Sequence, residues 1–276
     1  MLAASLITFR EGLEAALIVG IVLGYLKKIG RLDRQGYLWG GVIAAAIASL
    51  GVALGLQAIG AQFTGRAEEI FEGVTMFLAV GVLTWMIFWM RYQGRYIKVA
   101  LERDVQVAVT AGQNWALFGL AFITVFREGV ETALFLSAAG FVSAAANTLW
   151  GGLLGLGVAL LVGYLIFATA VRLDVKRFFD ATSVLLLLFA AGLLAPGVHE
   201  FQEAGLIPVM VEHVWDINHI LNEKSTPGSI LKALLGYNGN PSLLEVSSYV
   251  GYWVVVLGSV RWWMKRVGVR LAEGGA

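Results

Sequence analysis

The hydrophobic pattern along the chain predicts seven membrane-spanning helices. Long apolar runs that carry few charges are separated by shorter polar segments, and none of the runs has the alternating pattern of a strand. A hydrocarbon layer about 30 Å thick needs about 20 apolar residues for each helix that crosses it. Runs of that length cover residues 2–26, 36–60, 69–90, 114–141, 147–171, 178–198 and 247–266. The pattern therefore indicates an all-α integral membrane protein.

The composition supports a membrane protein and limits its chemistry. Of the 276 residues, 58% are hydrophobic and 14% are charged, against about 45–50% and about 25% in an ordinary soluble domain. The first run has no basic segment before it and contains Arg10, Glu11 and Glu14, so it is predicted to be a retained helix and not a signal peptide. The chain has no cysteine, which excludes metal sites built on thiolates.

Lysine and arginine fall mainly on alternate connections between the apolar runs. The first, third and fifth connections and the C-terminal tail hold fifteen of them: Lys27, Lys28, Arg31, Arg34, Arg91, Arg95, Lys98, Arg103, Arg172, Lys176, Arg177, Arg261, Lys265, Arg266 and Arg270. The second, fourth and sixth connections hold three: Arg66, Lys224 and Lys232. Because basic connections stay in the cytoplasm, this alternation predicts an outside N-terminus and a cytoplasmic C-terminus, as an odd number of spans requires.

Two segments of the chain are nearly identical. Residues Phe9 to Leu17 align with residues Phe126 to Leu134, and seven of the nine positions are the same. Because three helices per repeat is an odd number, we expect two inverted repeats, a common transporter plan with the site near the midplane. The expected organisation is a single transmembrane domain over residues 1–276: repeat one at about 1–91, repeat two at about 113–198, an outer connection of short helices at about 199–246, and a seventh helix at about 247–266.

Each repeat carries an Arg-Glu-Gly-x-Glu motif inside its first helix. A helix turns about 100° per residue, which places Glu14 about 40° and Glu11 about 100° from Arg10, so all three side chains share one face. Arg10 can pair with Glu14, and Glu11 and Glu14 can converge on a common ligand. Gly12 falls on another side, where it can admit a neighbouring backbone. The second motif, Arg127 to Glu131, repeats this arrangement.

The charges of the two motifs suggest that they bind a cation. A charge near the bilayer centre costs at least about 2.5–3.5 kcal/mol, so these groups must pair, become neutral or face water. Two arginines and four glutamates leave a net charge of −2, which a polyvalent cation would cancel. Carboxylate oxygens suit hard cations such as Mg, Ca, Mn and oxidised iron better than Cu(I). The alternative is an Arg–Glu network that only joins the halves, with the surplus carboxylates protonated. The candidate metal ligands are Glu11, Glu14, Glu128 and Glu131, and the motif arginines are Arg10 and Arg127.

Further polar residues near the predicted helix ends are weaker candidates. Those that could line an entrance or a pathway are Glu72, Asp180, His199, Glu200, Glu203, His213 and Asp216. His199 with Glu203, or His213 with Asp216, would share a face if each pair lay on a helix; the simpler interpretation of all seven is a solvated or capping group. Met86 and Met90 have a spacing used by some copper transporters, but a methionine pair at this spacing more often packs between helices.

The doubled Arg-Glu-x-x-Glu motif, in the first and fourth of seven predicted helices with an outside N-terminus, resembles the iron permease family. This family includes the fungal high-affinity iron permease and the bacterial ferrous-iron uptake permease, and the resemblance covers nearly the whole chain. It implies a multi-pass permease of the cell membrane, in bacteria the inner membrane, and no enzymatic activity. Iron is then the transported substrate, no cofactor is implied, and the four motif glutamates are the metal ligands.

The same resemblance implies partners and leaves alternatives open. Family members work beside an extracytoplasmic redox partner, which is an oxidase, a peroxidase or a cupredoxin-like protein, and this chain contains no such domain. Membrane lipid is expected around the helices, a homo-oligomer is left open, and no nucleic acid is expected. The ligands alone also fit a transporter of another cation such as manganese or lead. An intramembrane di-metal enzyme is disfavoured because no histidine lies inside a predicted helix, whereas helical di-iron sites use Glu-x-x-His pairs.

Overall fold

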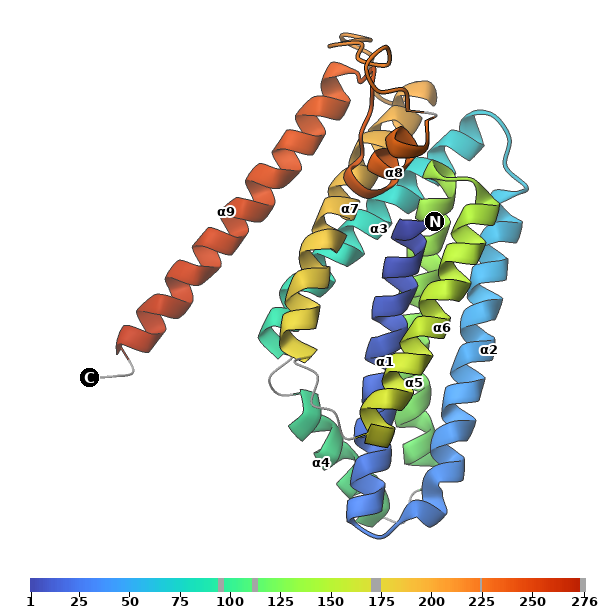
Figure 1. Ribbon diagram of the computed structural model, residues 1–276, viewed down its shortest axis with the longest axis vertical. Helices are drawn as coiled ribbons and strands as arrows, with labels where there is room; N and C mark the ends of the chain where they lie inside the picture. The colour runs from blue at the N-terminus through green and yellow to red at the C-terminus, as the bar shows by residue number, and fades with distance from the viewer. Residues whose placement is uncertain (94–96, 111–113, 170–174, 224, 274–276) are drawn as a thin grey trace.

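A computed structural model describes residues 1–93, 97–110, 114–169, 175–223 and 225–273, and α-helices dominate it (Figure 1). The apolar runs form α1 (Leu2–Lys28), α2 (Gln35–Gly60), α3 (Arg66–Gln93), α5 (Asn114–Val142), α6 (Ala145–Thr169), α7 (Val175–Glu203) and α9 (Leu243–Glu273). The described residues also contain α4 (Ile97–Thr110), α8 (Thr226–Leu235) and a short 3-10 helix, Leu32–Arg34. The all-helical prediction is confirmed for these residues.

The helix bounds differ from the sequence prediction in two places that matter. The third connection contains α4, which the hydropathy pattern missed because this 14-residue helix is amphipathic and too short to span a bilayer. Its buried residues Val105 and Ala108 pack in a cluster with Val22 and Leu38. In addition, α7 continues to Glu203, so the prediction that no histidine lies inside a helix is wrong for His199.

Within the described residues, five helices are long and apolar enough to cross a membrane, namely α2, α3, α6, α7 and α9. The two remaining predicted spans are α1 and α5, which have 27 and 29 residues. Each contains one arginine and two glutamates of its motif, which interrupt an otherwise apolar run. The structure therefore shows a multi-pass membrane protein, and the crossing of α1 and α5 stays a prediction.

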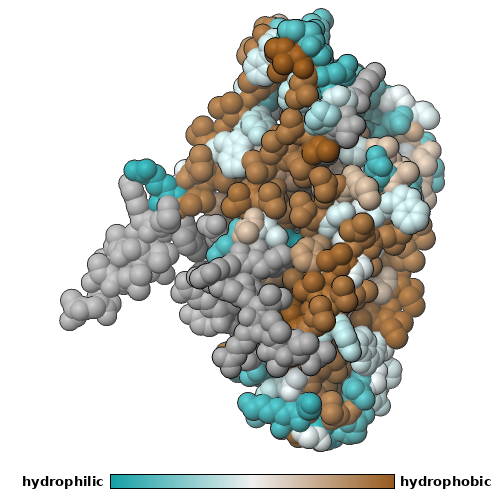
Figure 2. Space-filling view, in the orientation of Figure 1, coloured by the Kyte–Doolittle hydropathy of each residue, from teal (hydrophilic) through white to brown (hydrophobic). Residues whose placement is uncertain are grey.

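The helices pack around α1 and α5 at the centre of the bundle. α1 packs against α6, α2 packs against α5, α3 packs against α7, and α1 also contacts α5 directly. α9 leans away from the bundle and contacts α7, while α8 and α4 lie at opposite ends of the molecule (Figure 1). On the face drawn in Figure 2, hydrophobic side chains cover the middle and hydrophilic ones gather at the two ends. This distribution fits a slab of lipid around the middle of the bundle.

Small residues allow the central helices to approach closely. A Cβ atom built on Gly155 of α6 would collide with the backbone of Ser5 in α1, and one built on Gly163 would lie 2.9 Å from the Cβ of Ala16. Lipid gives no hydrophobic driving force between helices, so close van der Waals packing over small residues replaces it. The same kind of seam joins α2 to α5, where a Cβ on Gly41 would meet the backbone of Phe118.

Candidate functional site

The two motifs lie beside each other where α1 meets α5. One carboxylate oxygen each from Glu11, Glu128 and Glu131 lies within 4.8 Å of the other two, and all three residues are buried. Among the described residues, this is the one group of three or more His, Cys, Asp or Glu side chains whose ligand atoms converge in this way. A point equidistant from the corners of a triangle with 4.8 Å sides is about 2.8 Å from each corner, so small side-chain shifts bring all three oxygens to the distances of about 2.0–2.6 Å that hard cations require.

Arg10 is completely buried and contacts both glutamates of its own motif. Its Nη1 atom donates to Oε1 of Glu11 at 2.6 Å, and its Nη2 atom lies 3.6 Å from Oε2 of Glu14. The guanidinium also faces the ring of Phe179 in α7 at 5.8 Å from its centroid. The pairing with the adjacent Glu11 is therefore closer than the predicted i,i+4 pairing with Glu14.

Arg127 has a more open environment. Its side chain is 39% exposed and lies over the ring of Trp89 in α3, 5.2 Å from the ring centroid. Its Nε atom donates to Oε1 of Glu128 at 3.0 Å, its Nη2 atom donates to the same oxygen, and its Nε atom lies 3.7 Å from Oε1 of Glu131. The second motif thus repeats the pairing of the first, but its arginine reaches solvent-accessible space.

Several carboxylate oxygens in this group lack a hydrogen bond. The Oε2 atoms of Glu11, Glu14 and Glu131 are buried and accept none from any part of the chain that the structure describes. A buried polar group without a partner is costly, and a buried charge more so. The two arginines supply two positive charges against four carboxylates, so a cation between the free oxygens would satisfy both the charge and the missing contacts.

The motif glycines explain how the two helices can sit so close to their neighbours. A Cβ atom built on Gly12 would lie 2.9 Å from the Cβ of Ala159 in α6, and one built on Gly129 would collide with the side chain of Ser49 in α2. The sequence predicted that Gly12 could admit a neighbouring backbone, whereas the nearest atoms there belong to the side chains of Ala159 and Leu156. Gly12 therefore lets α6 pack closely against α1, and Gly129 lets α2 pack closely against α5.

The structure brings together three of the four predicted ligands and adds residues that the sequence did not indicate. Glu14 is buried beside Arg10 but lies outside the group of three. Met86 and Met90 of α3, which the sequence left as packing residues, contact the guanidinium of Arg10 through their sulfur atoms. Their i,i+4 spacing indicated that the two methionines share a helical face. It could not indicate that this face contacts Arg10.

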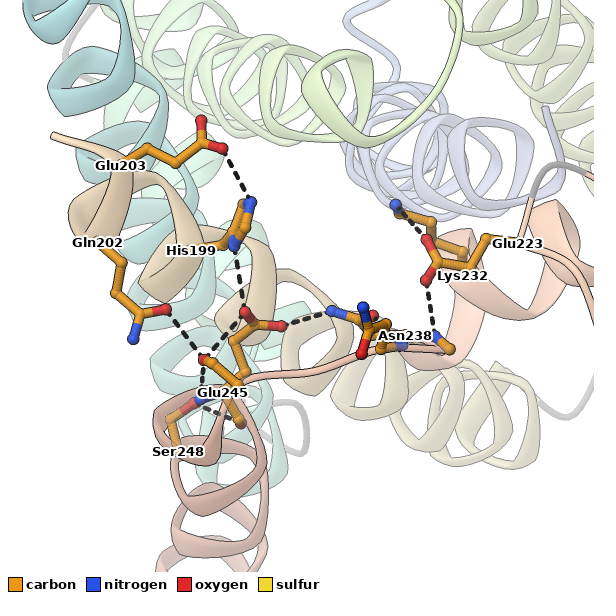
Figure 3. A network of polar contacts seen from close by, with 11 residues as sticks. His199, Gln202, Glu203, Glu223, Lys232, Asn238, Glu245 and Ser248 are labelled. Atoms are coloured by element: carbon orange, nitrogen blue, oxygen red, sulfur yellow. Dashed lines mark hydrogen bonds and ion pairs between the residues drawn. The ribbon is translucent and has the colours of Figure 1, made fainter. Parts of the chain in front are cut away.

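His199, Glu203 and Glu245 form a separate polar network at the end of the bundle that holds α8 (Figure 3). His199 lies between Oε1 of Glu203 and Oε1 of Glu245, each at 3.2 Å. Glu245 also accepts hydrogen bonds from Ser242 and Asn238. Ser242 directly precedes α9, and its Oγ atom accepts a hydrogen bond from the backbone N–H of Glu245, as in a capping box. Glu245 thus joins α7, the outer connection and α9.

A cavity of about 290 Å³ lies beside this network. Its polar lining comes from α7, the outer connection and the start of α9, and includes His199, Glu200, Glu223, Asn238 and Glu245. Apolar side chains, such as those of Phe141, Val142 and Pro196, also line the cavity. Sequence reasoning missed Glu245 and Glu223, whose roles depend on a connection that folds back over the bundle.

The remaining predicted pathway residues lie apart from the central group. His213 and Asp216 are exposed in a segment without helix, so the condition under which they would share a helical face is not met. Asp216 instead accepts a hydrogen bond from the backbone N–H of Asn218. Glu72 is partly buried in α3, and Asp180 is exposed in α7. Residues 211–217 are not helical, and their backbone N–H groups instead pair with the carbonyl oxygens of Gly239 and Pro241.

The fold and the site together define a multi-pass membrane protein that buries a cluster of carboxylates between its helices. Residues 1–271 match the iron permease FTR1 family, and the chain belongs to it. It is therefore a permease and not an enzyme.

Relatives of this family share most of the chain. The ferrous iron permease EfeU of Yersinia pestis is 38% identical over 259 residues, which cover 93% of this chain and 92% of that protein. EfeU of Escherichia coli O157:H7 is also 38% identical over 259 residues, 93% of this chain and 94% of that protein. EfeU of Yersinia pseudotuberculosis serotype I is 39% identical over 254 residues, 91% and 89% of the two chains. No solved structure matches the chain.

Proposed function

We propose that the protein imports ferrous iron across the cell membrane and holds the ion at Glu11, Glu128 and Glu131. The observation that carries the proposal is the convergence of these three buried carboxylates from α1 and α5. Two of them have an oxygen without a hydrogen bond, which leaves ligand atoms free for an incoming cation. The names of the relatives supply the identity of the ion.

Arg10 and Arg127 limit how tightly the site can hold the ion. Each guanidinium competes with the cation for a carboxylate of its own motif. A conduction site must bind strongly enough to admit an ion and weakly enough to release it. With all four motif glutamates counted, the two arginines reduce the net negative charge around the site from −4 to −2 and keep the affinity moderate.

The transport domain is proposed to consist of two inverted repeats, α1 to α3 and α5 to α7. In these repeats α1 corresponds to α5, α2 to α6 and α3 to α7. The contacts between the helices follow this correspondence, because the α1–α6 contact has its equivalent in the α5–α2 contact, and the α3–α7 and α1–α5 pairs are each their own equivalent. This pattern supports the proposal. The segment from Phe9 to Leu17 and its copy then lie on opposite sides of the axis that relates the halves, where α1 contacts α5. With basic connections in the cytoplasm, the N-terminus and α8 face outside, and α4 faces the cytoplasm.

The cavity beside His199 is proposed as the entrance. Three carboxylates, Glu200, Glu223 and Glu245, line it with one lysine, Lys232, which pairs with Glu223 at 2.9 Å, so carboxylates outnumber the lysine. The cavity lies at the end of the bundle assigned to the outside. A charged cavity with low-dielectric walls raises the local concentration of the opposite charge. An extracytoplasmic redox partner of the kind that the family employs would deliver the ion to this entrance.

Uptake by proteoliposomes tests the proposed function. Purified protein should take up radioactive iron kept reduced by ascorbate, and Glu128→Gln should abolish the uptake while the purified variant elutes from a sizing column like the wild type. Manganese added in excess tests the alternative cation. Iron uptake that Glu128→Gln leaves unchanged would contradict the site, and uptake of manganese without iron would contradict the proposed substrate.

A further inference from the structure

Two thioether groups contact the guanidinium of Arg10. Its Nη1 atom lies 3.2 Å from the sulfur of Met86, and its Nη2 atom lies 2.6 Å from the sulfur of Met90. Thioether sulfur is a weak acceptor of hydrogen bonds. A completely buried arginine that served only as a structural counter-charge would be better satisfied by carbonyl or hydroxyl oxygens, and the Nε atom of Arg10 has no hydrogen bond within the described residues.

The donor atoms around this guanidinium form a mixed set of sulfur and oxygen. Met86 and Met90 contribute two sulfur atoms, while Glu11 and Glu14 contribute carboxylate oxygens at 2.6 and 3.6 Å. The i,i+4 spacing of the methionines directs both sulfurs from α3 toward α1. The guanidinium is thus a tethered cation that occupies a place where four potential metal ligands converge.

The second motif has no such set among the described residues. Arg127 lies over the ring of Trp89, and its polar contacts are Glu128 and Glu131. Trp89 belongs to the same turn of α3 as Met86 and Met90, so one helical segment contacts both motif arginines and gives each a different surface. The thioether contacts are therefore a property of the Arg10 half, and the doubled motif alone does not account for them.

The donor types specify the cation. Thioether ligands favour softer metals, whereas carboxylates suit hard ones, and a set that combines both suits a borderline divalent ion such as Fe²⁺ better than Mn²⁺, Mg²⁺, Ca²⁺ or oxidised iron. A divalent ion on the free oxygens of Glu11 and Glu131 would also repel the guanidinium, because the ion and Arg10 share Glu11. Displacement of Arg10 would then expose the second set of ligands beside the first.

We infer that Met86, Met90 and Glu14, with Glu11 shared, form a second cation position that Arg10 fills when no ion is present and that selects ferrous iron over harder divalent cations. The inference rests on the proposed function and deepens it. Two adjacent positions let an arriving ion weaken the hold on the ion ahead of it. Arg10 acts as an internal competitor that returns to the position once the ion has left.

Competition between two cations tests this inference. Proteoliposomes with the wild type or with the Met86→Leu/Met90→Leu variant take up ferrous iron and manganese together under anaerobic conditions. Leucine keeps the volume and apolar character of methionine but removes the sulfur. The iron-to-manganese uptake ratio of the double variant is expected to fall by about an order of magnitude, with the manganese rate unchanged. Met76→Leu, a buried methionine about three turns earlier in α3, is the matched control and should keep the wild-type ratio.

The outcomes separate the inference from the proposed function. An unchanged ratio in the double variant, or an equal loss of uptake for both cations, would overturn the second position. The methionines would then only pack against Arg10. If the double variant does not fold, the iron-to-manganese uptake ratio is measured instead on the single variants Met86→Leu and Met90→Leu, and it is expected to fall in each. Wild-type protein that moves neither cation would overturn the proposed function, and the second position with it.

Discussion

Glu131→Gln should abolish high-affinity iron uptake with little damage to the fold. Glu131 belongs to the group of three carboxylates, yet its Oε1 atom is 3.7 Å from Arg127 and its Oε2 atom accepts no hydrogen bond from the described residues. Of the three ligands, it therefore has the weakest polar contacts to lose when no ion is bound. The amide of glutamine keeps the shape of the side chain and removes one negative charge.

The size of the effect follows from the distances. At about 2.8 Å from the cation and an effective dielectric constant of about 20, one carboxylate contributes about 6 kcal/mol for each unit of cation charge before desolvation is subtracted. After desolvation, removal of one partner from a buried set of charges costs about 3–5 kcal/mol. This cost corresponds to a fall of at least about a hundredfold in the apparent affinity for iron.

Initial rates of iron uptake, measured in proteoliposomes over a range of iron concentrations, give the apparent affinity. Glu14→Gln provides the comparison, because Glu14 is a buried motif glutamate outside the group of three. As a ligand of the proposed second position only, its loss should cost less, about tenfold. An affinity of Glu131→Gln within twofold of the wild type would refute the reasoning. A larger loss for Glu14→Gln than for Glu131→Gln would show that the wrong carboxylates have been assigned.

Three further results are expected. Gly129→Ala should lower the unfolding temperature in detergent, at a cost of about 1–3 kcal/mol, because its Cβ would collide with the side chain of Ser49, whereas Gly119→Ala in the same helix meets no atom within 4 Å and should not. Ferrous iron at about a hundred times its Kd should stabilise the wild type by about 2.7 kcal/mol and Glu131→Gln hardly at all, which thermal scans with and without the ion can measure. Glu200→Gln should slow uptake at low ionic strength, and the difference should disappear at about 1 M salt, where the screening length falls to about 3 Å; a difference that persists in salt would argue against an electrostatic entrance.

The positions of the helices could be predicted from the sequence because hydrophobic length is a local property. Every predicted span corresponds to a helix whose bounds agree within a few residues at most ends. The shared face of Arg10, Glu11 and Glu14 also follows from helix geometry alone. By contrast, α4 escaped the prediction because a short amphipathic helix has neither the length nor the continuous apolar character of a span.

The outer connection shows where local reasoning fails. His213 and Asp216 would share a face on a helix, but hydrogen bonds from this segment to the backbone of Gly239 and Pro241 hold it in a non-helical path. Glu245 has no signal in the sequence beyond a capping position at the start of a helix. Its contact with His199 exists because residues 199–242 fold back and place the start of α9 beside the end of α7.

The sequence by itself determined that this chain is a helical membrane protein with two buried, charged motifs and a surplus of negative charge. The tertiary structure alone decided which groups meet: Glu11 joins Glu128 and Glu131, Glu14 stays beside Arg10, and two methionine sulfurs face that arginine. The physical reason is that the spacing along one helix fixes the directions of its own side chains. The partner that each side chain reaches depends on how closely the small residues of α1, α2, α5 and α6 let these helices pack.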